Sequence, residues 1–280
     1  MFPSIFLHRR TVMKRYTFMA LFVVILITLL TSISMALENY EALKFGTPPV
    51  IDGDLNEWSD VPGVFLTGSL TVTGQLDGTD VYKDWETLGV ETWESDADLS
   101  ATFYAAWDDS NFYFACLAKD DIHLNAGSGD SIWNGDGLQL AIDPTNAKTD
   151  YGNWVYEYGY SLTTNPLVFR WSVNPASTGE TSTFAIVRDD AAGTTTYEIA
   201  IPAGDIAPAV LAAGKVLGFS MILNENDTSG GQGGWVGWGS HAIVYGKNAP
   251  KTNDLTFVAD VASAVSSGSK LSTTWGSIKN

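Results

Sequence analysis

The sequence predicts an all-β protein, namely a two-sheet antiparallel β-sandwich with a jelly-roll-like strand arrangement. Two observations support this fold class. Short runs rich in β-branched and aromatic residues recur along the chain, and clusters of Gly, Asn, Asp and Pro separate them. Helical periodicity is nearly absent, apart from one short helix-like segment at 205–213 that Pro208 interrupts. Many short strands separated by such turns are typical of sandwiches and barrels.

The strand pattern is clearest in the middle of the chain. Residues 99–107 and 111–118 form a predicted hairpin, because the polar residues between them are typical of a tight turn. The further expected strands are 137–143, 154–162, 167–173, 183–187, 195–201, 216–223, 234–238 and 255–258. Residues 68–97 combine several glycines with Trp85 and Trp93, so we interpret them as an insertion rather than a linker.

The N-terminus has the features of an export signal. A basic region precedes an apolar run, and Ser34-Met35-Ala36 supplies the small residues of a cleavage site. We therefore expect a signal peptide at 1–36, with Met13 as an alternative start, and one β-sandwich domain at 37–280. An uncleaved membrane anchor at 16–36 is the alternative interpretation. Both interpretations place the domain outside the cytoplasm, in the extracellular space, in the periplasm or on the cell surface.

The charge and the single cysteine narrow the class of protein. The 280 residues have a formal net charge of −17, and four of the 15 basic residues lie before the apolar run, so the exported part is even more acidic. Such a surface repels phosphate backbones, which argues against nucleic acid as a partner, and it attracts cations such as calcium. Cys116 lies in an apolar run and is expected to be a small buried core residue.

Catalytic patterns are weak, and we expect a binding protein rather than an enzyme. His123 and His241 have no recognisable zinc spacing, and no Gly-x-Ser-x-Gly motif occurs. A glycosidase needs only two carboxylates, so a catalytic pair stays an open alternative. The acidic residues on or near predicted strands are Asp136, Asp143, Glu157 and Glu198.

The ten tryptophans of the chain are stronger evidence for a binding site than the carboxylates are for a catalytic one. The segment 133–144 begins with Trp133 at a Gly/Asp turn and continues as an alternating strand, with Gln139 on its polar side. Sugar rings stack on indole, while their hydroxyl groups need amide or carboxylate partners. Trp238 also lies between glycines, and Trp235 is three residues away, so the two indoles should point to opposite faces. Trp58 and Trp107, in apolar surroundings, are expected in the core.

A second candidate site is the loop that contains Asp52, Asp54 and Asn56. These residues match the first three ligand positions of a calcium loop, but the glycine at position six and the glutamate at position twelve are absent. The loop therefore predicts either a calcium site or a turn that leads into a short helix.

Four segments of the sequence, taken together, are more specific than any one motif. They are PVIDGDLNEW at 49–58, WDDSNFYF at 107–114, WNGDGLQLAID at 133–143, and YEIAIP at 197–202 followed by LGFS at 217–220 and NEND at 224–227. In order and spacing they resemble carbohydrate-binding module family nine, within the DOMON-like group of β-sandwiches. The resemblance implies structural calcium and the binding of glucan or xylan chains, as poly- or oligosaccharide, without catalysis.

The resemblance also implies a site in which two tryptophans enclose the sugar. Trp133 matches one of them, and Trp238 matches the other, with Trp235 as the alternative. Gln139 occupies a position where the family often has glutamate, so it would bind sugar hydroxyls without a charge. The remaining expected binding residues are Asn224, Asn226 and Arg170. Such modules often work beside glycoside hydrolases or at the cell surface.

Two other functions stay open. Some DOMON-like sandwiches bind haem for electron transfer, and Met221 with His123 or Lys119 would supply its ligands; otherwise Met221 is a core residue. Alternatively, the protein is a structural or adhesive surface protein whose aromatic residues make protein contacts. Burial or wide separation of Trp133 and Trp238 would favour that interpretation over sugar binding.

Overall fold

The computed structural model describes residues 39–69, 71–73, 85–87, 91–149, 155–228, 230–244 and 248–262. The predicted signal peptide and much of the predicted insertion at 68–97 lie outside these residues. From Tyr40 onward, the described residues belong to one compact unit. None of the helices within the described ranges has the length and apolar character needed to cross a membrane.

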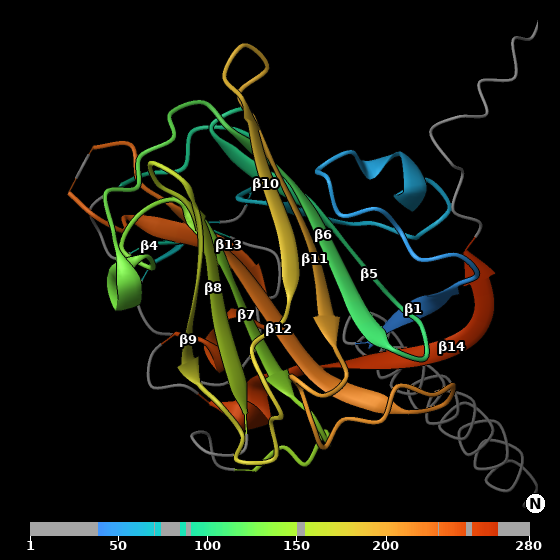
Figure 1. The fold of residues 1–280 in the computed structure, drawn as a ribbon. Helices are drawn as coiled ribbons and strands as arrows, with labels where there is room; N and C mark the ends of the chain where they lie inside the picture. Colours follow the sequence, from blue (N-terminus) through green and yellow to red (C-terminus); the bar gives the residue numbers. More distant parts are fainter. Residues whose placement is uncertain are drawn as a thin grey trace, which may run out of the picture. The chain divides into compact units, whose positions relative to one another are not determined.

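Fourteen strands dominate this unit, as the predicted all-β class requires (Figure 1). They are β1 Asn39–Phe45, β2 Val64–Thr67, β3 Thr71–Thr73, β4 Trp85–Thr87, β5 Leu99–Trp107, β6 Asn111–Asp120, β7 Gly137–Asp143, β8 Tyr156–Leu162, β9 Pro166–Ser172, β10 Thr183–Asp189, β11 Thr194–Pro202, β12 Val216–Glu225, β13 Gly234–Trp238 and β14 Asn253–Ala262. Four short 3-10 helices accompany them: η1 Leu55–Trp58, η2 Gly129–Ser131, η3 Ser240–Ala242 and η4 Ala249–Lys251.

The helix-like segment at 205–213 does not form a helix. This stretch forms turns, and its Ala207–Pro208 peptide bond is cis. Proline supplies no backbone N–H group, so Pro208 cannot donate the hydrogen bond that a helix interior needs.

The strands form two packed layers. The order β10-β11-β6-β5 makes the first layer, and β9-β8-β7-β12-β13-β4-β3 makes the second. Hydrogen bonding continues from one layer to the other through β1 and β14, so the two expected sheets are joined at one edge. Most pairs are antiparallel, but β1 with β5 and β3 with β4 are parallel. The prediction of an antiparallel sandwich is therefore confirmed, with two short parallel pairs added to it.

The core lies between the layers because one face of each strand is apolar. Phe114 of β6 meets Phe219 of β12 with ring centroids 5.6 Å apart. Phe103 of β5 meets Trp238 of β13 at 5.5 Å. Trp107 and Cys116 are buried in the same core, as predicted from the sequence. These contacts stabilise the sandwich by removing large aromatic surfaces from water.

The outer face of the first layer is also covered. The segment around η1 packs there, with Trp58 buried as predicted. Glu198 of β11 anchors this segment: its Oε1 accepts a hydrogen bond from the Trp58 indole N–H (2.9 Å), and its Oε2 accepts the amide N–H groups of Asp52 and Gly53, each at 2.9 Å. Burial is the largest effect on the pKa of Glu198 and raises it, while these hydrogen bonds act in the opposite direction.

Candidate functional site

Trp133 lies in the loop that joins η2 to β7. Its side chain is 42 % exposed, and it is the one exposed tryptophan among those whose burial the structure describes. The main chain around it is fixed, because the Asn134 amide donates to the Ser131 carbonyl (3.0 Å) and the Asn224 side-chain amide donates to the Trp133 carbonyl (3.1 Å). An indole is thus held outward on an ordered backbone.

The outer face of the second layer places amide groups beside this loop. On β7, the apolar Leu138, Leu140 and Ile142 point into the core, so Gln139 lies on the opposite face. Asn224 of β12 lies on that face as well, and its Nδ2 donates to the Gln139 Oε1 (3.1 Å). The structure therefore brings together Trp133, Gln139 and Asn224, three of the residues predicted from the sequence.

The network continues through two residues that sequence reasoning did not assign to the site. Gln232 donates from Nε2 to the Asn224 Oδ1 (2.6 Å), and Gln139 Nε2 lies 3.5 Å from a carboxylate oxygen of Glu157 on β8. Glu157 thus supplies, from the neighbouring strand, a carboxylate next to the uncharged Gln139.

Two half-buried aromatic residues on β9 flank the same face. Phe169 and Trp171 have ring centroids 5.5 Å apart. Trp171 lies over Gly159, where a Cβ atom would come within 2.4 Å of its ring, and Gly159 is the register partner of Gln139. The sequence signal for this pair is the spacing of Phe169 and Trp171 by two, opposite a glycine in the adjacent strand.

Trp238 does not form the second half of an aromatic clamp. Its side chain is 2 % exposed and points between the layers, where it packs against Phe103 and Phe219. Trp235 does lie on the outer face, since it is the register partner of Asn224, but Ile243 and Ala249 cover it. The two indoles point to opposite faces as predicted, yet both are buried, so the two-tryptophan clamp is a wrong prediction for this structure.

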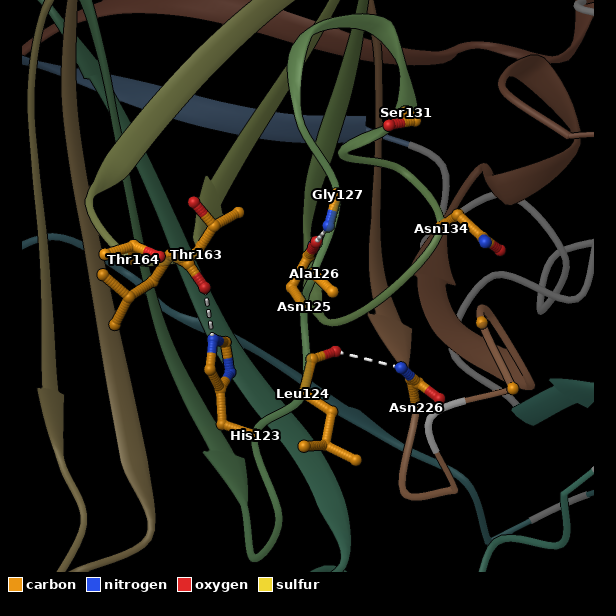
Figure 2. Close-up of a pocket in the computed structure, with 13 residues that line it drawn as sticks. His123, Leu124, Asn125, Ala126, Gly127, Ser131, Asn134, Thr163, Thr164 and Asn226 are labelled. Atoms are coloured by element: carbon orange, nitrogen blue, oxygen red, sulfur yellow. Dashed lines mark hydrogen bonds between the residues drawn. The ribbon is translucent and has the colours of Figure 1, made fainter.

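A pocket of about 580 Å³ adjoins the Trp133 loop. Figure 2 shows its lining, which comes from the loop after β6, the turn between β8 and β9 and the loop after β12. Asn226 is part of this lining, and its Nδ2 donates to the Leu124 carbonyl at 3.0 Å. Asn125 and Asn134 add further amide groups. The predicted site residue Asn226 therefore lies in a polar pocket next to Trp133.

Arg170 does not point toward this face. It pairs with Tyr158 in the register of β8 and β9, and its guanidinium lies 5.8 Å from the Tyr158 ring, a core residue. It also forms an ion pair with Glu180 and donates to the Gly179 carbonyl (3.0 Å). The prediction that Arg170 binds sugar is corrected, because its donors are used on the inner side of β9.

The loop at Asp52, Asp54 and Asn56 has the structure of a turn. The Asp52 carboxylate accepts the Asp54 amide (2.9 Å), and Asp54 is the N-cap of η1, accepting the Asn56 amide (3.1 Å). The structure thus shows the turn that leads into a short helix, and a calcium ion at this loop stays a prediction.

Carboxylates do converge at another place, at the strand ends behind the pocket. Burial and the charge of Asp120 raise the pKa of Asp136 to about 9, and burial and the charge of Asp136 raise that of Glu225 to about 12. Burial also raises the pKa of Asp227, to about 6. The carboxyl groups of Asp136 and Glu225 are thus buried close to other acidic groups, which disfavours their charged forms.

The residues expected to bind haem make other contacts in this structure. Met221 is a buried core residue of β12, and the rings of Phe219 and Trp238 occupy the space around it. His123 Nε2 donates to the Leu162 carbonyl (2.8 Å), and the Lys119 amino group donates to the Ala192 carbonyl. The structure favours the core interpretation of Met221.

A β-sandwich with an exposed indole beside an amide-rich sheet face belongs to the class of ligand-binding sandwich modules. Sequence similarity identifies the particular family. Residues 76–248 match the family described as carbohydrate family 9 binding domain-like, and since this is more than half of the chain, the protein belongs to that family.

Two solved structures show the same fold. One is a family 9 carbohydrate-binding module from Caldicellulosiruptor kristjanssonii in complex with cellotriose; it is 15% identical, covers 81% of this chain and 97% of its own, and has a TM-score of 0.58. A family 9 module from the same organism in complex with glucose is 15% identical, covers 78% and 96%, and has a TM-score of 0.56. Among curated proteins, none matches the chain.

Proposed function

We propose that this chain is a non-catalytic carbohydrate-binding domain whose site is the outer face of β7, β8 and β12 beside Trp133. The carrying observation is that Trp133 is exposed on a fixed backbone next to the hydrogen-bonded amides of Gln139 and Asn224. The apolar face of a sugar would stack on the indole, and its hydroxyl groups would reach the exposed Asn134 amide, which can both donate and accept. Gln139 and Asn224 are only 4 % and 1 % exposed, so they would support the Trp133 loop from beneath.

The proposed ligand class is a β-linked glucan or xylan chain, as polysaccharide or oligosaccharide. Family membership and the cellotriose and glucose complexes of the two similar structures support this class. The pocket beside Trp133, at about 580 Å³, has the size of an ordinary small-ligand site and would accept the adjoining sugar unit. Gln139 and Glu157 are both buried beneath this surface, with the Gln139 Nε2 3.5 Å from the Glu157 carboxylate.

Titration with cello- and xylo-oligosaccharides, followed by tryptophan fluorescence and calorimetry, tests this function. We expect saturable binding, and we expect Trp133→Ala to weaken it about two- to tenfold, because loss of aromatic stacking costs about 0.5–1.5 kcal/mol. The matched control is Phe65→Ala, which removes a 48 % exposed ring from β2 in the other layer and should leave binding unchanged.

Equal binding by Trp133→Ala and the wild type would rule out the indole as the contact. Absence of binding to every glycan tested would favour a structural or adhesive surface protein instead. The burial of Trp238 gives that second interpretation its support, since it removes the two-tryptophan clamp.

We also propose that the domain is exported and works near glycoside hydrolases or the cell surface. The basic and apolar N-terminal segment with its small-residue cleavage site supports export. N-terminal sequencing of the protein recovered outside the cell tests this: a start at Leu37 indicates cleavage, whereas a retained 1–36 segment indicates an anchor.

A further inference from the structure

Trp171 lies at an irregularity in the pairing of β8 with β9. The residue before it pairs with Tyr158 and the residue after it pairs with Glu157, so Trp171 is the extra residue of a β-bulge. Bulges redirect side chains and are common beside binding sites. Here the indole lies over Gly159, where a Cβ atom would come within 2.4 Å of the ring. The bulge and the glycine together place a large aromatic ring on the outer face of the second layer.

The Trp171 indole is joined to the Trp133 loop by a hydrogen bond. Its Nε1–H donates to the carbonyl of Asp130 in η2 (2.9 Å), three residues before Trp133. Phe169, on the same face of β9, has its ring centroid 5.5 Å from that of Trp171. Both side chains are half-buried, so part of each ring is open to solvent. Because the indole N–H is already used, Trp171 offers a ligand its ring rather than a donor.

The sheet beneath this ring offers a ligand no accessible polar side chain at Gln139 or Glu157. Both residues are buried, and Gly159, the register partner of Gln139, lies directly under the Trp171 indole. The surface that a ligand meets over this part of β8 and β9 is therefore aromatic. It is connected through η2 to the loop that carries the exposed Trp133.

We propose that Trp171 and Phe169 form a second stacking platform, so that the site binds an internal stretch of a β-linked glucan or xylan chain rather than a chain end. This inference rests on the proposed function of the Trp133 face and extends that face across β9. Two indoles that face each other enclose one sugar ring, which suits the end of a chain. Two platforms on one surface contact successive rings and leave both ends of the chain free. Trp238, which would have closed the site as a clamp, is buried in the core.

The experiment compares ligand lengths by calorimetry, with glucose, cellobiose and cellohexaose as the probes. We expect the wild type to bind cellohexaose more tightly than the shorter sugars. Trp171→Ala should weaken cellohexaose binding about two- to tenfold, the usual contribution of one aromatic contact. It should leave the shortest sugar that binds unaffected, because that sugar contacts only Trp133. Equal affinity of the wild type for cellobiose and cellohexaose would overturn the proposal.

Trp171→Phe separates the platform from a role in holding the Trp133 loop. Phenylalanine keeps a ring but loses the hydrogen bond to Asp130, so this variant should bind cellohexaose more tightly than Trp171→Ala does. A residue that only positions the loop would instead give equal losses in both variants, for short and long sugars alike, and that result would overturn the platform. Phe169→Leu keeps apolar volume without an aromatic face and supplies the same test if Trp171→Ala does not fold, as judged by thermal melting.

Cellohexaose whose reducing end has been opened with borohydride tests the internal mode of binding. We expect it to bind as cellohexaose does, whereas a loss of tenfold or more would indicate recognition of the chain end and overturn the proposal. The matched control is Val168→Ala, on the opposite face of β9 in register with Tyr160, which should not change binding. Binding that needs Trp133 but neither Trp171 nor Phe169 would overturn this inference alone. Absence of binding to every sugar would overturn the proposed function with it.

Discussion

Trp238→Ala is expected to lower the free energy of unfolding by about 3–5 kcal/mol, the usual cost of deleting a buried tryptophan. The indole fills the space between the layers, with Phe103 at 5.5 Å and Phe219 at 6.2 Å between ring centroids. Alanine would leave a cavity that two sheets joined at one edge cannot readily close. Urea unfolding followed by circular dichroism measures the loss.

The informative comparison is with Trp133→Ala. Trp133 is exposed, so Trp133→Ala should change the unfolding free energy little but weaken sugar binding. Trp238→Ala should lower the unfolding free energy but leave sugar binding unchanged at a temperature where the variant is folded. A stable Trp238→Ala protein that has lost its ligand would instead indicate that Trp238 turns out of the core and encloses the sugar.

Glu198→Ala is expected to be similarly damaging, lowering stability by about 3 kcal/mol or more, since hydrogen bonds to a charged acceptor contribute about 1.5–3 kcal/mol each and are not additive. The substitution leaves the Trp58 indole N–H and the amides of Asp52 and Gly53 without their acceptor. The η1 segment should then detach from the first layer, and hydrogen exchange should increase there first.

A double-mutant cycle with Trp58→Phe separates the contributions. Phenylalanine keeps most of the ring packing but has no N–H to satisfy, so Glu198→Ala should cost less in the Trp58→Phe background. Additive effects of the two substitutions would show that the hydrogen bond between Trp58 and Glu198 contributes little.

The strands were predictable wherever one face of the segment is apolar. The expected strands at 137–143 and 234–238 coincide with β7 and β13, because a period of two is visible without knowledge of the partner. β1 to β4 were not recognised as strands. β2, β3 and β4 are only three or four residues long, and β1 mixes charged and apolar residues. Their pairing depends on residues far away in the chain, which local patterns do not report.

The site was predictable in part for the same reason. Alternation places Gln139 away from the core, but its contact with Asn224 depends on the register of β7 and β12, which no local pattern shows. Alternation also separates Trp235 from Trp238, without showing that both faces of β13 are covered. The position of Trp171 near Gln139 could not be predicted either, because it depends on the register that places Gly159 opposite Phe169.

The residues that cover Trp235 reduce the area of the second layer's outer face that a ligand can contact. Glu86 accepts a hydrogen bond from Ser240 (2.7 Å) and contacts His241 (3.1 Å), and the chain that follows places Ile243 against the indole. An aromatic surface next to Asn224 is thus already present but occupied by the protein's own chain. If sugar binds to this face as proposed, the chain that follows β13 would limit the number of sugar units in contact, and shortening that chain would be the direct route to a longer binding groove.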